Sequence, residues 1–257
     1  IFIYFICFVF RFIEYFLLRT DQTFWGEAFV HKLIGILILF IAARYYNLNF
    51  SNIGFSKNKI WNGCLKGLAF GLLVFIPAYS AEIILTIMQG RFTGLSLYVS
   101  SYSVNGVIGN QTEVLFFVIC ITGNIINVIM EEGIFRGLFQ NMLEQKYSFI
   151  VSAVIGSCLF GLWHIIAPIR GYYDGTMGYN SLIANIILLV VTSGLMGFQL
   201  ALMTKLTNNL YMAMAHHFVN NTIVNILHVV SSTGADELMV VRIAIAQSIS
   251  FVTILLW

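Results

Sequence analysis

Long apolar runs alternate with short polar gaps along the 257 residues of the chain. A helix needs about 20 such residues to cross roughly 30 Å of hydrocarbon. The apolar runs lie at about residues 1–18, 28–46, 64–88, 112–143, 149–167, 181–203, 207–230 and 239–257. This pattern predicts an all-α fold, a polytopic transmembrane helix bundle of about eight spans, arranged as a single membrane domain over residues 1–257.

The composition supports a membrane protein and excludes several other classes. Charged residues make up 9% of the chain, against roughly 25% in an average soluble domain. The net charge of +2 provides no basic face for phosphates, so no nucleic-acid partner is expected. The lipid bilayer is the expected surroundings. The sequence starts at Ile1 rather than Met and stops at Trp257 inside an apolar run, so we expect terminal segments to be missing.

Ionisable groups at membrane depth are costly and persist when they are paired or functional. The first such cluster is Met130-Glu131-Glu132-Gly133-Ile134-Phe135-Arg136. Residues i and i+4 share a helix face, so Glu132 and Arg136 are expected to form an ion pair. Glu131 points about 100° away and is left without a partner. An unpaired carboxylate of this kind suits a general base or a metal ligand, whereas a simple helix-end salt bridge would leave Glu131 unexplained.

Two further helices carry polar residues at the same spacing. Phe160 and His164 form one i, i+4 pair, and His164 can hydrogen-bond to a carboxylate of another helix. The segment His216-His217-Phe218-Val219-Asn220-Asn221 offers two overlapping pairs, His216/Asn220 and His217/Asn221. An imidazole and an amide on one face suit a developing oxyanion. We expect the three clusters to converge on one site inside the bundle, as helix bundles build sites from facing helices.

Other polar residues in the apolar runs are interpreted as structural. Arg11 and Glu14 lie one turn apart and can pair with each other, while Glu82 and Glu113 have no obvious partner in the sequence. The chain has no HExxH motif, and no GxSxG motif suggests a serine nucleophile.

These residues resemble the motifs of the CPBP family, which comprises CAAX prenyl proteases and bacteriocin-processing enzymes (the Abi group). The family pattern is EExxxR, then FxxxH, then HxxxN, on separate transmembrane helices. Glu131, Glu132 and Arg136 match the first motif, and Phe160 with His164 matches the second. The third is matched by His217 with Asn221, which we favour, or by His216 with Asn220. The motif-bearing core spans about residues 112–230.

The resemblance implies an eight-helix intramembrane endopeptidase that hydrolyses a membrane-associated peptide or protein. Glu131 with His164 would activate a water, His217 and Asn221 would stabilise the oxyanion, and Glu132 with Arg136 would fix the helix. Glu131, His164 and His217 would also make a zinc-type ligand set with an open water position. The same groups work as a glutamate-type protease without metal. The sequence leaves open whether a divalent metal such as Zn²⁺ takes part.

Other functions and the location follow from weaker signals. A catalytically inactive scaffold of the same fold is opposed by the intact motifs. A proton-coupled carrier would require inverted repeats, and the sequence shows none. The Ile-, Phe- and Asn-rich, Pro-poor composition is typical of low-GC bacteria and points to the bacterial cytoplasmic membrane. A bacterial member is expected to cleave peptide precursors such as bacteriocin leaders.

Overall fold

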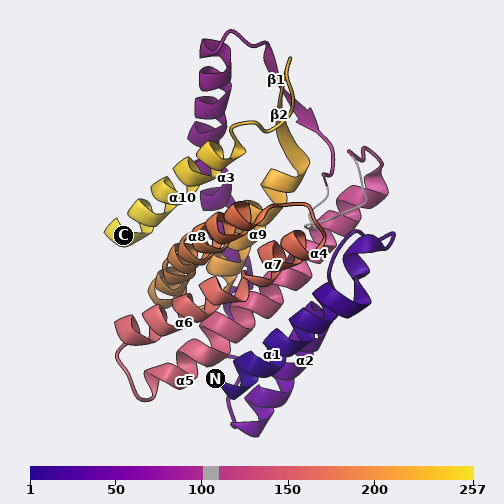
Figure 1. Ribbon diagram of the computed structural model, residues 1–257. Helices are drawn as coiled ribbons and strands as arrows, with labels where there is room; N and C mark the ends of the chain where they lie inside the picture. The colour runs from indigo at the N-terminus through magenta and orange to yellow at the C-terminus, as the bar shows by residue number, and fades with distance from the viewer. Residues whose placement is uncertain (101–109) are drawn as a thin grey trace.

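The computed structural model describes residues 1–100 and 110–257, and helices account for most of them (Figure 1). The elements in chain order are α1 (Phe2–Ile13), η1 (Glu14–Leu18), η2 (Thr20–Gln22), α2 (Val30–Tyr45), η3 (Lys57–Lys59), α3 (Ile60–Met88), β1 (Thr93–Leu97), α4 (Val114–Glu132), η4 (Gly133–Phe139), α5 (Gln140–Glu144), α6 (Phe149–Trp163), α7 (Ile166–Tyr173), α8 (Tyr179–Thr207), α9 (Tyr211–Ile226), β2 (Leu227–Ser231) and α10 (Met239–Leu256). The all-α expectation is therefore confirmed in its main point.

Among the described residues, five helical segments are long and apolar enough to cross a membrane. They are Lys57–Met88, Val114–Glu144, Phe149–Tyr173, Tyr179–Thr207 and Met239–Leu256. The expectation of about eight spans is not confirmed. The helices α2 and α9 have 16 residues each, which is short of the roughly 20 that a full crossing needs. The chain is an integral membrane protein.

Glycines on α3 bring α9 close to it and thereby place the third motif. Gly63, Gly67 and Gly71 follow one another at intervals of four and are all buried. A Cβ atom on Gly67 would lie 2.4 Å from the carbonyl oxygen of Met212 and 2.7 Å from Cβ of Ala215. Only a residue without a side chain fits there, as in other close helix contacts in membranes.

The helix α2 packs against the end of α4 in a similar way. A Cβ atom on Gly133 would lie 2.5 Å from Cδ2 of Leu39. Leu39, Met130, Ile134 and Trp163 belong to one buried cluster, which α1, α2, η4 and α6 share. Figure 1 shows α1 and α2 side by side along the bundle, next to α4. The end of α4 is therefore enclosed by helices from both halves of the chain.

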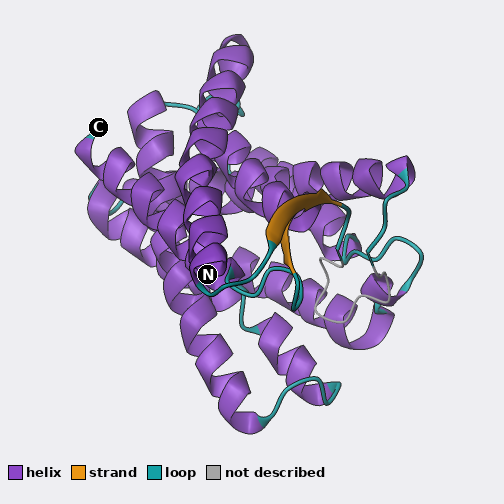
Figure 2. Cartoon of the chain, turned by 90° about the horizontal axis from the view of Figure 1, so that it is seen from above, coloured by secondary structure: helices purple, strands orange, loops and turns teal. Residues whose placement is uncertain are grey.

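The structure corrects the sequence interpretation at the end of α9. The apolar run 207–230 was expected to be helical throughout, but α9 stops at Ile226 and residues 227–231 form β2. This strand pairs antiparallel with β1, in register Thr93↔Ser231. The Tyr79 hydroxyl donates to the carbonyl oxygen of Leu227 at 2.6 Å, which satisfies a group that the helix no longer uses. Figure 2 shows the strand pair against a helical background.

Buried ion pairs hold this end of the bundle together. Arg242 of α10 lies 2.6 Å from Oε2 of Glu82 on α3 and 3.0 Å from Oδ1 of Asp236. Asp236 also accepts a hydrogen bond from His228 of β2. Glu82, for which the sequence offered no partner, is thus part of a structural network. Glu113 lies exposed at the N-cap of α4.

Candidate active site

Glu131 lies buried near the end of α4, with each carboxylate oxygen held by a different neighbour. Its Oε1 accepts a hydrogen bond from the indole N–H of Trp163 at 2.9 Å. Its Oε2 accepts one from the amide of Asn127 at 3.1 Å. Nη1 of Arg11 lies 3.6 Å from Oε1. The carboxylate expected to be unpaired therefore has a cationic partner, which comes from α1 and could not be found by helix spacing.

Glu132, the adjacent carboxylate, forms the ion pair that the spacing predicts. Nη1 of Arg136 lies 3.0 Å from Oε1 of Glu132. The same oxygen accepts a hydrogen bond from Nδ1 of His217 at 2.8 Å. Oε2 of Glu132 is buried without a hydrogen-bond partner among the described residues. Arg136 also stacks over the ring of Phe160, with 4.0 Å from Cζ to the ring centre.

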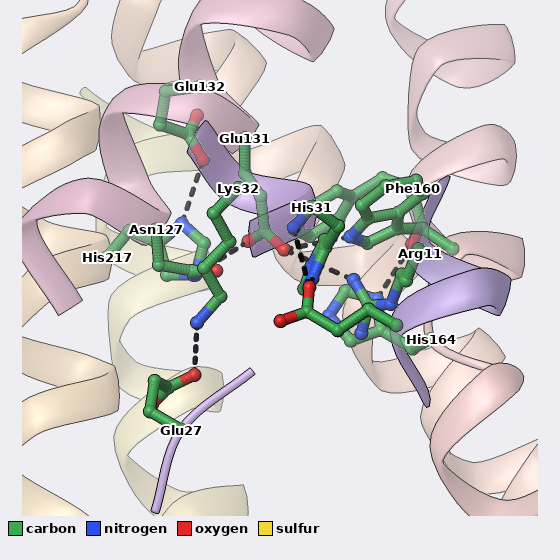
Figure 3. Close-up of polar contacts among 12 residues, drawn as sticks. Arg11, Glu27, His31, Lys32, Asn127, Glu131, Glu132, Phe160, His164 and His217 are labelled. Carbon is green, nitrogen blue, oxygen red and sulfur yellow. Dashed lines mark hydrogen bonds and ion pairs between the residues drawn. The ribbon is translucent and has the colours of Figure 1, made fainter. Parts of the chain in front are cut away.

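His217 connects the two carboxylates. Since its Nδ1 faces the Glu132 carboxylate, Nδ1 carries the proton and the other nitrogen is the free one in a neutral ring. That Nε2 lies 3.7 Å from Oε2 of Glu131. In Figure 3 the Glu131 carboxylate lies between His217 on one side and Arg11 with His164 on the other. A water that bonds to both His217 and Glu131 would lie beside this gap.

The neighbouring His216 faces away from the carboxylates. Its Nε2 lies 3.0 Å from the hydroxyl of Ser250 on α10 and 3.3 Å from the amide of Gln199 on α8. The side chains of the two histidines thus contact different residues, because adjacent residues point about 100° apart on a helix. Of the two registers left open by the sequence, the one through His217 contacts Glu131 and Glu132.

His164 follows the last residue of α6 and is half-buried. Its Nδ1 donates to the carbonyl oxygen of Phe160 at 2.8 Å, which leaves Nε2 as the free nitrogen in a neutral ring. Its ring lies edge-on to Phe160, with centres 4.8 Å apart. Within the described residues, His164 makes no hydrogen bond to either glutamate, so the expected direct bond to a carboxylate is not formed in this structure.

Asn221 lies one turn after His217 on α9. Its side-chain oxygen accepts a weak hydrogen bond from the amide of Asn220 at 3.3 Å. The NH₂ of Asn221 is therefore the end of this side chain that can donate to a ligand.

Several residues around the site were not singled out from the sequence. Asn127 precedes Glu131 by four positions, so the i, i+4 rule used for Glu132 would have found it. Trp163 is adjacent to His164, but no polar residue lies four positions away from it to mark it in the sequence. Arg11 was expected to pair with Glu14. The structure overturns that pairing, because Glu14 accepts hydrogen bonds from the backbone N–H groups of Val30 and His31 and from the His31 ring.

A further buried ion pair is drawn in Figure 3. Lys32 of α2 bonds to Glu27. Both side chains are largely withdrawn from solvent. Buried charges are stable only when an opposite charge lies close to them. The carboxylates of Glu27, Glu131 and Glu132 each have a cationic partner.

The donor types near Glu131 are those of a zinc site, but their arrangement does not complete one. In residues 1–100 and 110–257, no three His, Cys, Asp or Glu side chains lie close enough together to hold a metal ion. Glu131 with His217 is one close pair, at 3.7 Å, and His164 does not join it. A three-ligand zinc site would therefore require His164 to move toward this pair.

Two openings flank the carboxylates along the helix. A polar cavity of about 160 Å³ reaches Arg136 and Gly137 from the loop end, between Gln140, Lys205 and Asn208. An apolar groove of about 470 Å³ is lined by Val128, Ile129, Met214 and Phe218 among others. Along the chain, Glu131 and Glu132 thus fall between the residues that line the apolar groove and those that line the polar cavity.

Comparison with known proteins gives one family. Residues 113–223 match the family described as type II CAAX prenyl endopeptidase, Rce1-like. The match covers all three motifs and confirms the resemblance to the CPBP family of intramembrane proteases. No curated protein matches the chain.

Proposed function

We propose, from the match of residues 113–223 to the Rce1-like CAAX prenyl endopeptidases, that the protein is an intramembrane endopeptidase. It hydrolyses a peptide bond of a membrane-associated peptide or protein with a water activated by Glu131. The observation that carries this proposal is the contact set of Glu131. A buried carboxylate faces a histidine nitrogen at 3.7 Å and has its other oxygen held by Trp163.

Glu131 is the general base of the proposed reaction. Trp163 and Arg11 occupy Oε1, while Oε2 has Asn127 as its one hydrogen-bond donor among the described residues. A carboxylate oxygen can accept two hydrogen bonds, so Oε2 retains a position for a water. Glu131 takes the proton of that water as the oxygen attacks the substrate carbonyl, and it gives the proton to the amine nitrogen as the C–N bond breaks. His164 lies on the opposite side of Glu131 from His217, so it would contact this water only after moving toward Oε2.

His217 and Asn221 are the proposed oxyanion donors. Both lie on α9, one turn apart, and the Glu132 carboxylate orients the His217 ring through Nδ1. His217 donates to the oxyanion as the doubly protonated ring, in which Nε2 also carries a proton. Donors fixed in advance in a water-poor site stabilise a developing oxyanion more than they would in water. Glu132, with its charge paired to Arg136, therefore orients His217 rather than acting as a second base.

We also propose a substrate class and a cellular location. A peptide or protein held at the bilayer is the substrate class that the family implies, with prenylated CAAX peptides and bacterial peptide precursors as the two forms to test. The composition supports a bacterial cytoplasmic membrane.

Purified protein incubated with internally quenched peptides tests the proposal. One peptide set carries a prenylated cysteine near the C-terminus and the other set has no lipid. We expect cleavage by the wild type, and a fall in kcat/KM of about 10²- to 10⁴-fold for Glu131→Gln, the range that a general base contributes. Cleavage that survives this substitution would overturn the role of Glu131.

The matched control is Glu113→Gln, the same chemical change at the exposed N-cap residue of the same helix. It should leave cleavage unchanged. A parallel series with a chelator, followed by added Zn²⁺, decides the metal question. Reversible loss on chelation would assign a metal to Glu131 and the histidines, and indifference to the chelator would assign the metal-free mechanism. A wild type that binds the peptides but cleaves none would favour a scaffold.

A further inference from the structure

The N-terminal helix α1 contributes a charged group to the site, although it lies outside the matched segment 113–223. Arg11 is 6% exposed, and its Nη1 lies 3.6 Å from Oε1 of Glu131. Its guanidinium stacks over Trp163, with Cζ 4.5 Å from the ring centre. Trp163 itself donates to the same oxygen of Glu131. Arg11 and Trp163 thus form one unit, and both side chains contact the same carboxylate oxygen of Glu131.

The surroundings fix this unit rather than leaving Arg11 free to move. The rings of Tyr4 and Phe8, also on α1, pack against Trp163 with centres 6.3 Å away. Glu14 caps the N-terminal end of α2 by accepting the backbone N–H groups of Val30 and His31, at 2.8 and 2.6 Å. Since Glu14 is bound to α2 in this way, it does not compete for Arg11.

The charges around the two glutamates show why a cation is needed here. Arg136 already compensates Glu132 at 3.0 Å. A buried carboxylate without a counter-charge is strongly disfavoured, and a general base has to carry its negative charge to accept a proton. Arg11 is the guanidinium that contacts Glu131.

We propose that Arg11 is a positioning residue of the site. With Trp163 it holds Oε1 of Glu131 and compensates its charge, so that Oε2 is presented to the water. This inference rests on the proposed function, because the water is that of the proposed hydrolysis. It extends the site to a helix that carries none of the three motifs.

A double-mutant cycle in thermal stability tests the contact without any need for a substrate. The four proteins are the wild type, Arg11→Met, Glu131→Gln and the double variant, each unfolded by heat in the same detergent. We expect the loss in Tm of the double variant to be smaller than the sum of the two single losses by about 2–4 °C or more. Additive losses would overturn the proposal. Arg11→Gln replaces the methionine variant if that protein does not fold.

Cleavage kinetics test the positioning role. Arg11→Met should lower kcat by about 100-fold, the scale expected for a displaced catalytic group, with KM changed less than about twofold because no substrate contact is lost. Arg11→Lys keeps the charge but loses the planar stack, and should recover about tenfold of the lost rate. A wild-type kcat for Arg11→Met, or no recovery with lysine, would overturn the role.

Arg170→Met is the matched control. Arg170 also has an ion pair, with Asp174, and an aromatic neighbour, Phe16, but it makes no contact with Glu131. The loss in Tm caused by Arg170→Met should add to the loss caused by Glu131→Gln. The kcat of Arg170→Met should stay within about twofold of the wild-type value. Failure of the proposed function gives a different result, since the wild type itself would then cleave no peptide while the stability cycle would still report the Arg11–Glu131 contact.

Discussion

Nδ1 of His217 lies 2.8 Å from Oε1 of Glu132, although the two residues are 85 positions apart in the chain. The contact joins α9 to α4 and determines which ring nitrogen of His217 faces Glu131. It also distinguishes His217 from His216, whose ring lies against Gln199 and Ser250.

Substitution of the two adjacent histidines should therefore give different results. His217→Gln should lower kcat/KM by about 100-fold or more, because the oriented nitrogen beside Glu131 is lost. His216→Gln should keep kcat/KM within a few-fold and mainly lower Tm, because a buried hydrogen-bonded ring is removed. Peptide cleavage and thermal unfolding measure the two effects. Loss of cleavage in the His216 variant alone would assign the site to His216 and Asn220.

Trp163→Phe removes one hydrogen-bond donor from Glu131 and keeps most of the aromatic packing. Hydrogen bonds to charged groups contribute about 1.5–3 kcal/mol, so we expect kcat/KM to fall by about 10- to 100-fold. Trp61, which is 80% exposed, provides the control, and Trp61→Phe should have no effect on cleavage. Equal kinetics for the two variants would show that the indole N–H does not support Glu131.

The close contact between α3 and α9 predicts a sensitive glycine. Gly67→Ala would place a methyl group 2.4 Å from the Met212 carbonyl oxygen, so the helices must separate. Overpacking of this kind costs about 1–3 kcal/mol, and cleavage should fall with stability because α9 carries His217. Gly94→Ala, where no atom lies within 4 Å of the new Cβ, should leave Tm and kcat unchanged. Thermal unfolding of both variants measures the difference.

The network at the strand end predicts a pH dependence of stability. Burial alone would raise the pKa of Asp236, but the hydrogen bond from His228 and the charge of Arg242 outweigh it and lower that pKa. A lowered pKa in the folded state stabilises the fold above the unfolded value of about 3.9, and this contribution is lost as the pH falls through the folded value.

Asp236→Asn should accordingly lower Tm most at pH 6–7, and the gap to the wild type should narrow below about pH 4. Thermal unfolding across this pH range measures the gap. A gap that stays constant with pH would show that the charge of Asp236 does not stabilise the folded state.

The helices were largely predictable from the sequence, because each apolar run exceeds the length of most soluble helices and is bounded by polar residues. The site was predictable where spacing within one helix decides it, as for Glu132 with Arg136. Long-range contacts were not predictable in this way. Arg11 reaches Glu131 from another helix, and β2 forms because its partner strand lies in a distant loop, so neither follows from local periodicity.

The polar cavity that reaches Arg136 has a consequence for the supply of water. Each hydrolysed peptide bond consumes one water molecule, and the hydrocarbon interior of a bilayer holds none to spare. A cavity of about 160 Å³ accommodates several water molecules. Its lining residues Arg136 and Gly137 follow Glu132 in the chain, whereas Val128 and Ile129 of the apolar groove precede it. Water that enters at the loop end can thus hydrate the bundle as far as Arg136, while the groove beside Val128 and Ile129 stays dry because apolar side chains line it.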